Sequence, residues 1–386
     1  MENGEGYRGR RRAPRKRIGR TEIIMLVIAV VLVGFLVYWF GIRGCGSEPG
    51  DEEVLTPIYV TIYSHNEDSW EPLVDTLDEY QFYRENLLER LHLIDSYGAT
   101  LNWQSDWVVL EAMLRYENGE ILDSTNGKNI VEYMVEDLGF SADPHGHLVE
   151  YNYADLAKLI SDLGVEPSGV VGGCLYVECG KEPLVLYLDW HDIIELDPDG
   201  FITGRIYPDY RWRPTILAQP AQQGHYFDDF SSGVWKPGNG DDFYGHSEDN
   251  PLVYVGEGYP HDAVLLGPYM SSGARVEYRE AGYIKELVAK IRSGELPADR
   301  IYTASIHVRD LPVVAETGVP ENEALESLLK ELEPYVERGC VIYADYEEAA
   351  DIWAVNYDGV PNTVKIEDFS AYPNILEDFK EFCKGF

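Results

Sequence analysis

An uninterrupted apolar segment, Ile23–Ile42, constrains this chain more than any other feature of its sequence. The segment contains no charged residue and ends at Arg43. At about 1.5 Å of rise per residue, a helix of this length spans about 30 Å, the thickness of a bilayer core. Tyr38 and Trp39 lie near its outer end, where amphipathic aromatic rings favour the membrane interface. We therefore expect a transmembrane anchor over residues 22–43.

Basic residues before the apolar segment predict its orientation, because positively charged flanks stay in the cytoplasm. They are Arg8, Arg10, Arg11, Arg12, Arg15, Lys16, Arg17 and Arg20. Residues 1–21 then form a cytoplasmic tail, and the remainder lies outside the cytoplasm of a single-pass cell-membrane protein. The alternative is a cleaved signal peptide, which needs a shorter apolar region and small residues at a cleavage site. The sequence Ile42-Arg43-Gly44-Cys45 is a poor cleavage site.

Charge divides the chain in the same place. The whole chain has 31 basic and 68 acidic residues, and nine basic and three acidic residues precede Gly44. The remaining 22 basic and 65 acidic residues give residues 44–386 a net charge of −43. Such a surface repels nucleic acid and anionic lipid, so we expect no nucleic-acid partner. A saline environment, cation binding and simple solubility all remain compatible with it.

Residues 44–55 are rich in Gly, Pro and acidic residues and are predicted to be a linker. Residues 56–386 then form one extracytoplasmic domain, with an irregular, aromatic-rich insertion at about 174–270. Export permits disulfides. Cys174 and Cys179 are close enough in sequence to pair, and Cys340 could pair with Cys383. Free buried thiols are equally compatible with the sequence.

Strand-like and helical segments alternate in this domain, which predicts a parallel sheet with helices outside. The predicted strands include Ile58–His65, Ala99–Ser105, Phe140–His147, Ser168–Gly173, Arg300–Val308 and Cys340–Tyr346. The predicted helices include Trp70–Tyr97, Val108–Tyr116, Asn129–Leu138, Tyr153–Leu163, Tyr278–Ile291 and Glu321–Arg338. We expect an α/β fold that closes into an irregular (β/α) barrel of seven or eight strands. The chemistry of such barrels lies at the carboxyl ends of the strands.

Histidines gather at these strand ends. His65, His145, His147 and His307 are candidate ligands of a divalent metal, with zinc the best match to imidazole nitrogens. Residues i and i+2 of an extended segment face the same side, which places His145 beside His147. Each histidine taken alone is more typical of a hydrogen-bonded structural residue.

Carboxylates near the same strand ends complete the predicted site. Glu67 or Asp106 is the candidate general base for a water molecule, which a bound metal would make more acidic. Asp143 or Glu150 would orient the histidines by accepting a hydrogen bond from the ring nitrogen that does not bind the metal. Trp107 and Trp235 are candidate contacts for a sugar ring. Aromatic residues of the irregular insertion are equally compatible with a small core of its own.

Three segments resemble the glycoside hydrolase/deacetylase superfamily, which includes the polysaccharide deacetylases. Tyr59–Asp68 is similar to that family's first strand, Gly139–Ile160 to its histidine motif, and Cys340–Trp353 to its terminal strand and helix. The resemblance is divergent: Ser64–Glu67 replaces a pair of aspartates, and one residue rather than three separates His145 from His147. It implies a metal-assisted hydrolase directed at carbohydrate, with deacetylation and glycoside cleavage both open.

The sequence therefore predicts a membrane-anchored, extracytoplasmic, metal-dependent hydrolase whose partner is a carbohydrate polymer or glycan. The alternative is a non-catalytic module on the same fold, which binds glycan or belongs to the cell envelope. A calcium-loaded acidic domain is a third hypothesis.

Overall fold

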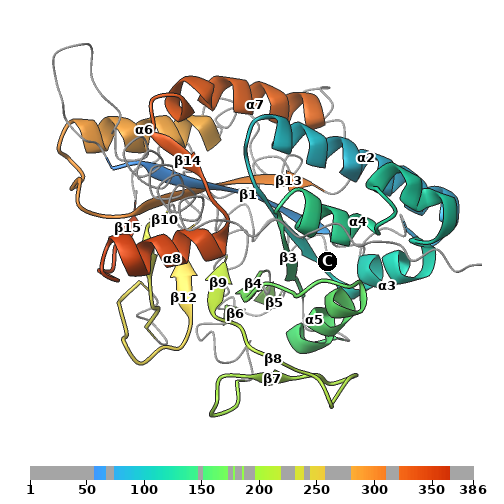
Figure 1. The fold of residues 1–386 in the computed structure, drawn as a ribbon. Coiled ribbons are helices and arrows are strands. Elements are labelled where there is room, and N and C mark those ends of the chain that lie inside the picture. The colour runs from blue at the N-terminus through green and yellow to red at the C-terminus, as the bar shows by residue number, and fades with distance from the viewer. Residues whose placement is uncertain are drawn as a thin grey trace, which may run out of the picture. The chain divides into compact units, whose positions relative to one another are not determined.

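The computed structural model describes most of the chain after the predicted anchor (Figure 1). The described residues are 56–66, 74–146, 151–172, 177–178, 185–186, 196–218, 231–238, 244–256, 280–309 and 321–365. They belong to one of the two units into which the chain divides, Gly44–Phe386. Within these ranges no helix has both the length and the apolar character that a bilayer span requires. Residues 22–43 lie outside them, so the anchor and the domain boundaries stay predictions.

Strand β1, Ile58–Asn66, is the central strand of a five-stranded parallel sheet. Its β-branched and aromatic residues favour an extended backbone, and every residue in it is buried. It pairs with β13 (Tyr302–Arg309), β2 (Leu101–Ser105) and β14 (Val341–Tyr343), and β2 pairs in turn with β3 (Ser141–Pro144). The prediction of an α/β fold with a parallel sheet is confirmed.

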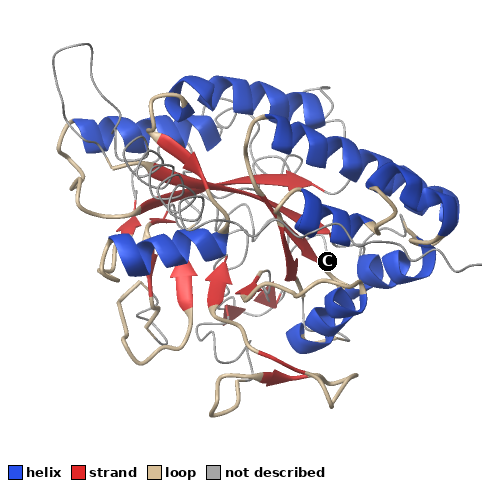
Figure 2. Ribbon diagram, in the orientation of Figure 1, coloured by secondary structure: helices blue, strands red, loops and turns tan. Residues whose placement is uncertain are grey.

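Helices alternate with these strands along the chain (Figure 2). They are α2 (Leu77–Ser96), α3 (Trp107–Tyr116), α5 (Tyr153–Asp162), α6 (Glu280–Arg292), α7 (Glu321–Val336) and α8 (Tyr346–Asn356). Several begin at a residue whose side chain accepts hydrogen bonds from the first-turn amides, a common helix-start arrangement. The residues are Thr76, Asp106, Asn152 and Asp345.

The predicted helix at Asn129–Leu138 is more irregular than expected. It starts as α4, Ile130–Glu132, and continues through Tyr133–Asp137 in π-helical geometry. A 3₁₀ helix, Gly119–Thr125, precedes it. Helical periodicity alone did not indicate this change of winding.

A second sheet has four short strands in the order β11 (Val234–Trp235), β12 (Val253–Val255), β9 (Ile216–Ala218) and β4 (Val170–Val171). Three two-stranded sheets accompany it. They are β5 (Val177–Glu178) with β6 (Val185–Leu186), β7 (Ile202–Thr203) with β8 (Arg211–Trp212), and β10 (Ser231–Ser232) with β15 (Val364–Lys365). The strands described here thus form separate sheets rather than one closed sheet.

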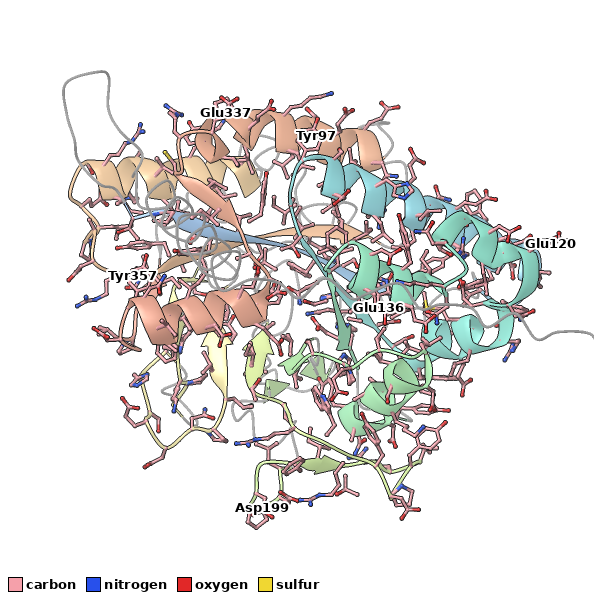
Figure 3. All side chains as sticks on the ribbon, in the orientation of Figure 1. Tyr97, Glu120, Glu136, Asp199, Glu337 and Tyr357 are labelled. Atoms are coloured by element: carbon pink, nitrogen blue, oxygen red, sulfur yellow. The ribbon has the colours of Figure 1, made fainter. Side chains whose placement is uncertain are left out.

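The two faces of β1 contribute to two apolar clusters. Ile58, Val60 and Ile62 belong to the larger cluster, which includes buried residues of α2, α6 and α7. Tyr59 and Tyr63 belong to a smaller one with residues of α8, β9 and β12. Acidic residues occupy the periphery, as the exposed Glu120, Glu136, Asp199 and Glu337 labelled in Figure 3 illustrate. Both sides of the parallel sheet are therefore covered, and the negative charge faces solvent.

Candidate functional site

One face of the parallel sheet is polar although it is buried. The strand register places side chains of β1, β2, β3 and β13 beside one another on this face. Each of the following is at most 6% exposed: Thr61, His65, Asn102, Gln104, Asp143, His145, Thr303 and Ser305. Burying polar groups is unfavourable unless each is hydrogen-bonded. The concentration of buried polar side chains on one sheet face makes this face the candidate functional site.

Three of the predicted histidines meet on this face. His65 lies on β1, His307 on β13, and His145 directly after β3. The ring centroids of His65 and His145 are 4.0 Å apart, and those of His65 and His307 are 5.0 Å apart. His145 is completely buried. We call these three residues the histidine cluster.

The histidine cluster by itself does not match a zinc site. Two imidazoles on one tetrahedral zinc, with Zn–N of about 2.0 Å, have centroids about 5 Å apart. The separation of His65 from His307 agrees with this, but His65 and His145 are closer and tilted by only 32°, which is nearer to stacking. Among the described side chains, no three His, Cys, Asp or Glu residues are placed to hold a metal ion. His147 lies outside the described residues, and its predicted ligand role is untested.

Asp143 is completely buried between two hydrogen-bond donors. Asn102 Nδ2 donates to its Oδ2 at 2.6 Å, and Ser168 Oγ donates to its Oδ1. The pKa of Asp143 is raised to about 8: burial is the largest cause, the hydrogen bonds from Ser168 and Asn102 oppose it, and the nearby carboxylates of Asp345 and Glu347 add to it. These bonds join Asp143 to a polar network with Asn102 and Ser168, rather than to an imidazole as predicted.

The first turn of α8 reaches this network. Tyr346 N donates to Asn102 Oδ1 at 3.0 Å, and Ser141 Oγ donates to Asp345 Oδ2 at 2.6 Å. Gly169 N donates to Glu347 Oε1 at 2.6 Å. The start of α8 therefore fixes the polar face from the side opposite the apolar cluster of α2, α6 and α7.

Gly172 allows the second sheet to approach the histidine cluster. It forms an isolated parallel bridge with His145, and Gly172 N donates to Pro144 O at 3.4 Å. A Cβ at this position would lie 2.0 Å from Gln104 Oε1, so a larger residue would displace Gln104. Gln104 itself pairs in register with His65. Glycine here leaves room for the Gln104 side chain, which its place in a Gly-rich run did not reveal.

Asp106 and Trp107 lie next to each other at the end of β2. Asp106 Oδ1 accepts a hydrogen bond from Val108 N at 3.0 Å and starts α3, a structural role that competes with that of general base. The Trp107 ring stacks on Tyr151, with centroids 5.2 Å apart and planes at 16°. Tyr151 OH donates to Glu111 Oε1 at 2.7 Å. Trp107 is partly exposed, which leaves its predicted sugar contact open.

Trp235 is placed differently from the prediction. It is completely buried, and its ring packs against Tyr254, with centroids 4.6 Å apart, and against Tyr244. This is the position of a core residue rather than of a sugar contact. Gly233, two residues before Trp235, has a positive φ, and a Cβ there would lie 2.1 Å from Asn362 O. Close backbone packing therefore explains the glycine at this position.

Two further predicted residues, Glu67 and Glu150, lie outside the described residues. Conversely, the structure adds residues that sequence reasoning had missed, notably Tyr63, Asn102 and Ser168. The available signal was the two-residue period of side-chain direction in a strand, which places Tyr63 on the same face as His65 and Asn102 on the same face as Gln104.

Comparison with known proteins gives no family for this chain. No protein-family model matches it, and no curated protein does. Among solved structures it is similar to the 4-alpha-glucanotransferase from Thermococcus litoralis, with a TM-score of 0.36 and 10% identity. The match covers 79% of this chain and 39% of that one.

Proposed function

We propose that this chain is a membrane-anchored, extracytoplasmic hydrolase that acts on carbohydrate, with its active site at the histidine cluster. The observation that carries the proposal is the meeting of His65, His145 and His307, which lie on or directly after three separate strands, on a buried polar sheet face. A structural histidine needs only one hydrogen-bond partner. Three imidazoles grouped at the carboxyl end of a parallel sheet lie where (β/α) proteins place their chemistry.

The cluster supplies groups suited to hydrolysis. A neutral imidazole accepts a proton from water near neutral pH and returns it to a leaving group. Glu67, two residues after His65, is the other candidate base in this proposal. The polar network of Asn102, Asp143 and Ser168 holds the strands that carry the histidines. Trp107 at the edge of the site is the proposed contact for a sugar ring.

A divalent metal, with zinc the best match to imidazole donors, is an optional part of this proposal. The histidines that the structure describes do not complete a metal site, so a bound ion would need His147, Glu67 or Glu150 as a further ligand. When bound, such an ion would acidify a water molecule. No step of the proposed reaction depends on the ion. Metal analysis of the purified chain distinguishes a metal-free hydrolase from a metal-dependent one.

We also propose that the strands belong to one irregular (β/α) barrel. Backbone bonds join the two larger sheets, since Ser168 N donates to Ala142 O at 3.1 Å and Gly172 N to Pro144 O. On the other side, Thr303 Oγ1 accepts from Gly233 N at 2.9 Å and Ser232 Oγ donates to Thr303 O at 2.8 Å. Hydrogen bonds that involve side chains thus link β13 to the segment that holds β10 and β11. In a regular barrel, backbone hydrogen bonds between neighbouring strands would make this connection.

Location outside the cytoplasm has support of a different kind. Cys340 is disulfide-bonded, and the other cysteines lie outside the described residues. Disulfides persist in oxidising compartments and are rare in the cytosol. The acidic surface and the basic tail before the apolar segment agree with the same topology.

The test uses the purified full-length chain in detergent with acetylated and de-acetylated polysaccharides as substrates. Release of acetate identifies a deacetylase, and release of new reducing ends identifies a glycosidase. We expect one of these activities, and we expect His145→Ala to reduce it by about a hundredfold or more, the usual contribution of a general acid–base group. His92→Ala, which changes an exposed histidine of α2, is the matched control. Binding of polysaccharide without either product would favour the non-catalytic glycan-binding alternative.

A further inference from the structure

We propose that Tyr63 is a positioning residue that fixes the imidazole rings of His65 and His307, a role that rests on the proposed active site around them. Its ring centroid lies 5.2 Å from that of His65 and 5.0 Å from that of His307. Tyr63 is completely buried. One aromatic ring therefore contacts two members of the histidine cluster at once.

The backbone dictates this arrangement. Residues i and i+2 of a strand face the same side, so Tyr63 and His65 lie on one face of β1. In the parallel pairing of β1 with β13, Tyr63 is the register partner of His307. A slip of one residue between β1 and β13 would put Tyr63 and His307 on opposite faces of the sheet. The contact of Tyr63 with both rings thus follows from the strand register and does not depend on a chance rotamer.

Tyr63 packs against Tyr346, the first residue of α8. The Tyr346 ring lies 6.2 Å from the Tyr63 ring at an angle of 46°. Tyr346 is held at both ends, because its backbone N donates to Asn102 Oδ1 at 3.0 Å and its hydroxyl lies 3.3 Å from Ser305 Oγ. Packed aromatic rings have few rotamers and low conformational entropy. The packed rings of Tyr346 and Tyr63 therefore restrict the movement of the neighbouring imidazoles of His65 and His307.

The chain offers a matched control in Tyr59. It lies four positions earlier on the same face of β1, is 6% exposed and belongs to the same apolar cluster as Tyr63. Its hydroxyl is hydrogen-bonded to Tyr357. A purely structural role predicts that replacing either tyrosine has the same kind of effect. A positioning role predicts that only Tyr63 affects the histidines.

The experiment measures the reactivity of individual histidines without requiring turnover. Full-length chain in detergent is treated with diethyl pyrocarbonate, and mass spectrometry gives the modification rate of each imidazole. Loss of an aromatic contact should loosen the neighbouring rings, so Tyr63→Leu should accelerate modification of His65 and His307 by roughly two- to tenfold. Tyr59→Leu should leave both rates within error of wild type, and so should Tyr63→Phe, which keeps the ring. Exposed His92 serves as the internal reference.

Equal acceleration by Tyr63→Leu and Tyr59→Leu, or no acceleration by Tyr63→Leu, would overturn the proposal. Tyr63→Met fills more of the volume and replaces Tyr63→Leu if that variant fails to fold, with the same expected result. The outcome is separable from the proposed function. If Tyr63→Leu exposes the histidines while His145→Ala leaves hydrolysis intact, Tyr63 positions the rings but the active-site assignment fails.

Discussion

The imidazole rings of His65 and His145 lie 4.0 Å apart at 32°, although one residue belongs to β1 and the other follows β3. Gln104 of the intervening strand β2 pairs in register with both His65 and Asp143. Residues in contact typically show coupling energies of about 0.5–3 kcal/mol in double-mutant cycles. The two histidines should therefore behave as one unit in any assay that either of them affects.

Replacing Asp143 with Asn should make the stability of the protein less dependent on pH. Burial raises the pKa of Asp143 to about 8 from the ordinary value of 3.8, so the folded state keeps a proton that the unfolded state has released. The free energy of unfolding of wild type should then fall as pH rises from about 4 to about 8, by on the order of 5 kcal/mol, because each pH unit between the two pKa values contributes about 1.4 kcal/mol. The Asp143→Asn variant has no proton to release at this position, so it should lack this loss of stability.

Urea denaturation at pH 5 and pH 8 measures the free energy of unfolding of both proteins. An amide at position 143 keeps an acceptor for Asn102 and can donate to Ser168, so the variant should fold. Asp162→Asn, at an exposed position of α5, should show the pH dependence of wild type. The same pH dependence in wild type and Asp143→Asn would contradict the burial argument.

Removing Glu117 should strongly destabilise the protein. Its Oε1 lies 2.7 Å from Arg84 Nε, and both side chains are at most 4% exposed. Glu117→Ala leaves a buried guanidinium without its counter-ion, which costs about 3–5 kcal/mol. The double variant Arg84→Met with Glu117→Leu should recover much of this loss, because apolar packing replaces the pair. Chemical denaturation measures both, with exposed Glu120→Ala as control; a cost for Glu117→Ala no larger than that of the control would refute the prediction.

Asp155 should hold the segment between β7 and β8 against α5. Its carboxylate accepts from the backbone N of Arg205, Ile206 and Tyr207, each at 2.9 Å. Asp155→Ala should leave these amides without their acceptor and cost about 1–3 kcal/mol. Hydrogen exchange should show faster exchange at 205–207, with the amides of β1 unchanged. Protection at 205–207 equal to wild type would show that other contacts hold the segment.

Trp235 and Trp107 should respond differently to truncation. Trp235→Ala empties a fully buried site and should cost about 3–5 kcal/mol of stability. Trp107→Ala, at a partly exposed ring, should cost less stability and should weaken oligosaccharide binding. Thermal melts and titration with oligosaccharide separate the two effects. If Trp235→Ala weakened oligosaccharide binding and kept full stability, Trp235 would be a sugar contact rather than a core residue.

Local pattern was enough to predict the sheet but not its details. The β-branched and aromatic residues of Ile58–His65 indicate a strand, and the two-residue period of side-chain direction then assigns its two faces. The start of α2 was placed too early, since the capping box of Thr76 and Glu79 fixes it at Leu77. The sheet partners of β9 and β12 could not be predicted from the sequence, because these strands have three residues each and pair with segments distant in sequence.

The site shows the same division. A parallel sheet brings the carboxyl ends of its strands together, which is why His65, His145 and His307 could be proposed as neighbours. The bonds of Asp143 could not be foreseen, because Asn102 and Ser168 carry no sequence signal for a shared network. Trp235 was misjudged because it lies in an irregular, aromatic-rich segment, and its packing against Tyr254 and Tyr244 has no signal in the local sequence.

The most direct test of the central claim is a double-mutant cycle on hydrolysis of polysaccharide by the full-length chain, using His65→Ala, His145→Ala and both together. Groups that act as one catalytic unit are strongly non-additive. We predict that each single substitution lowers kcat/KM by about a hundredfold or more and that the double variant is scarcely slower than either single one. Full kcat/KM in either single variant would contradict the account.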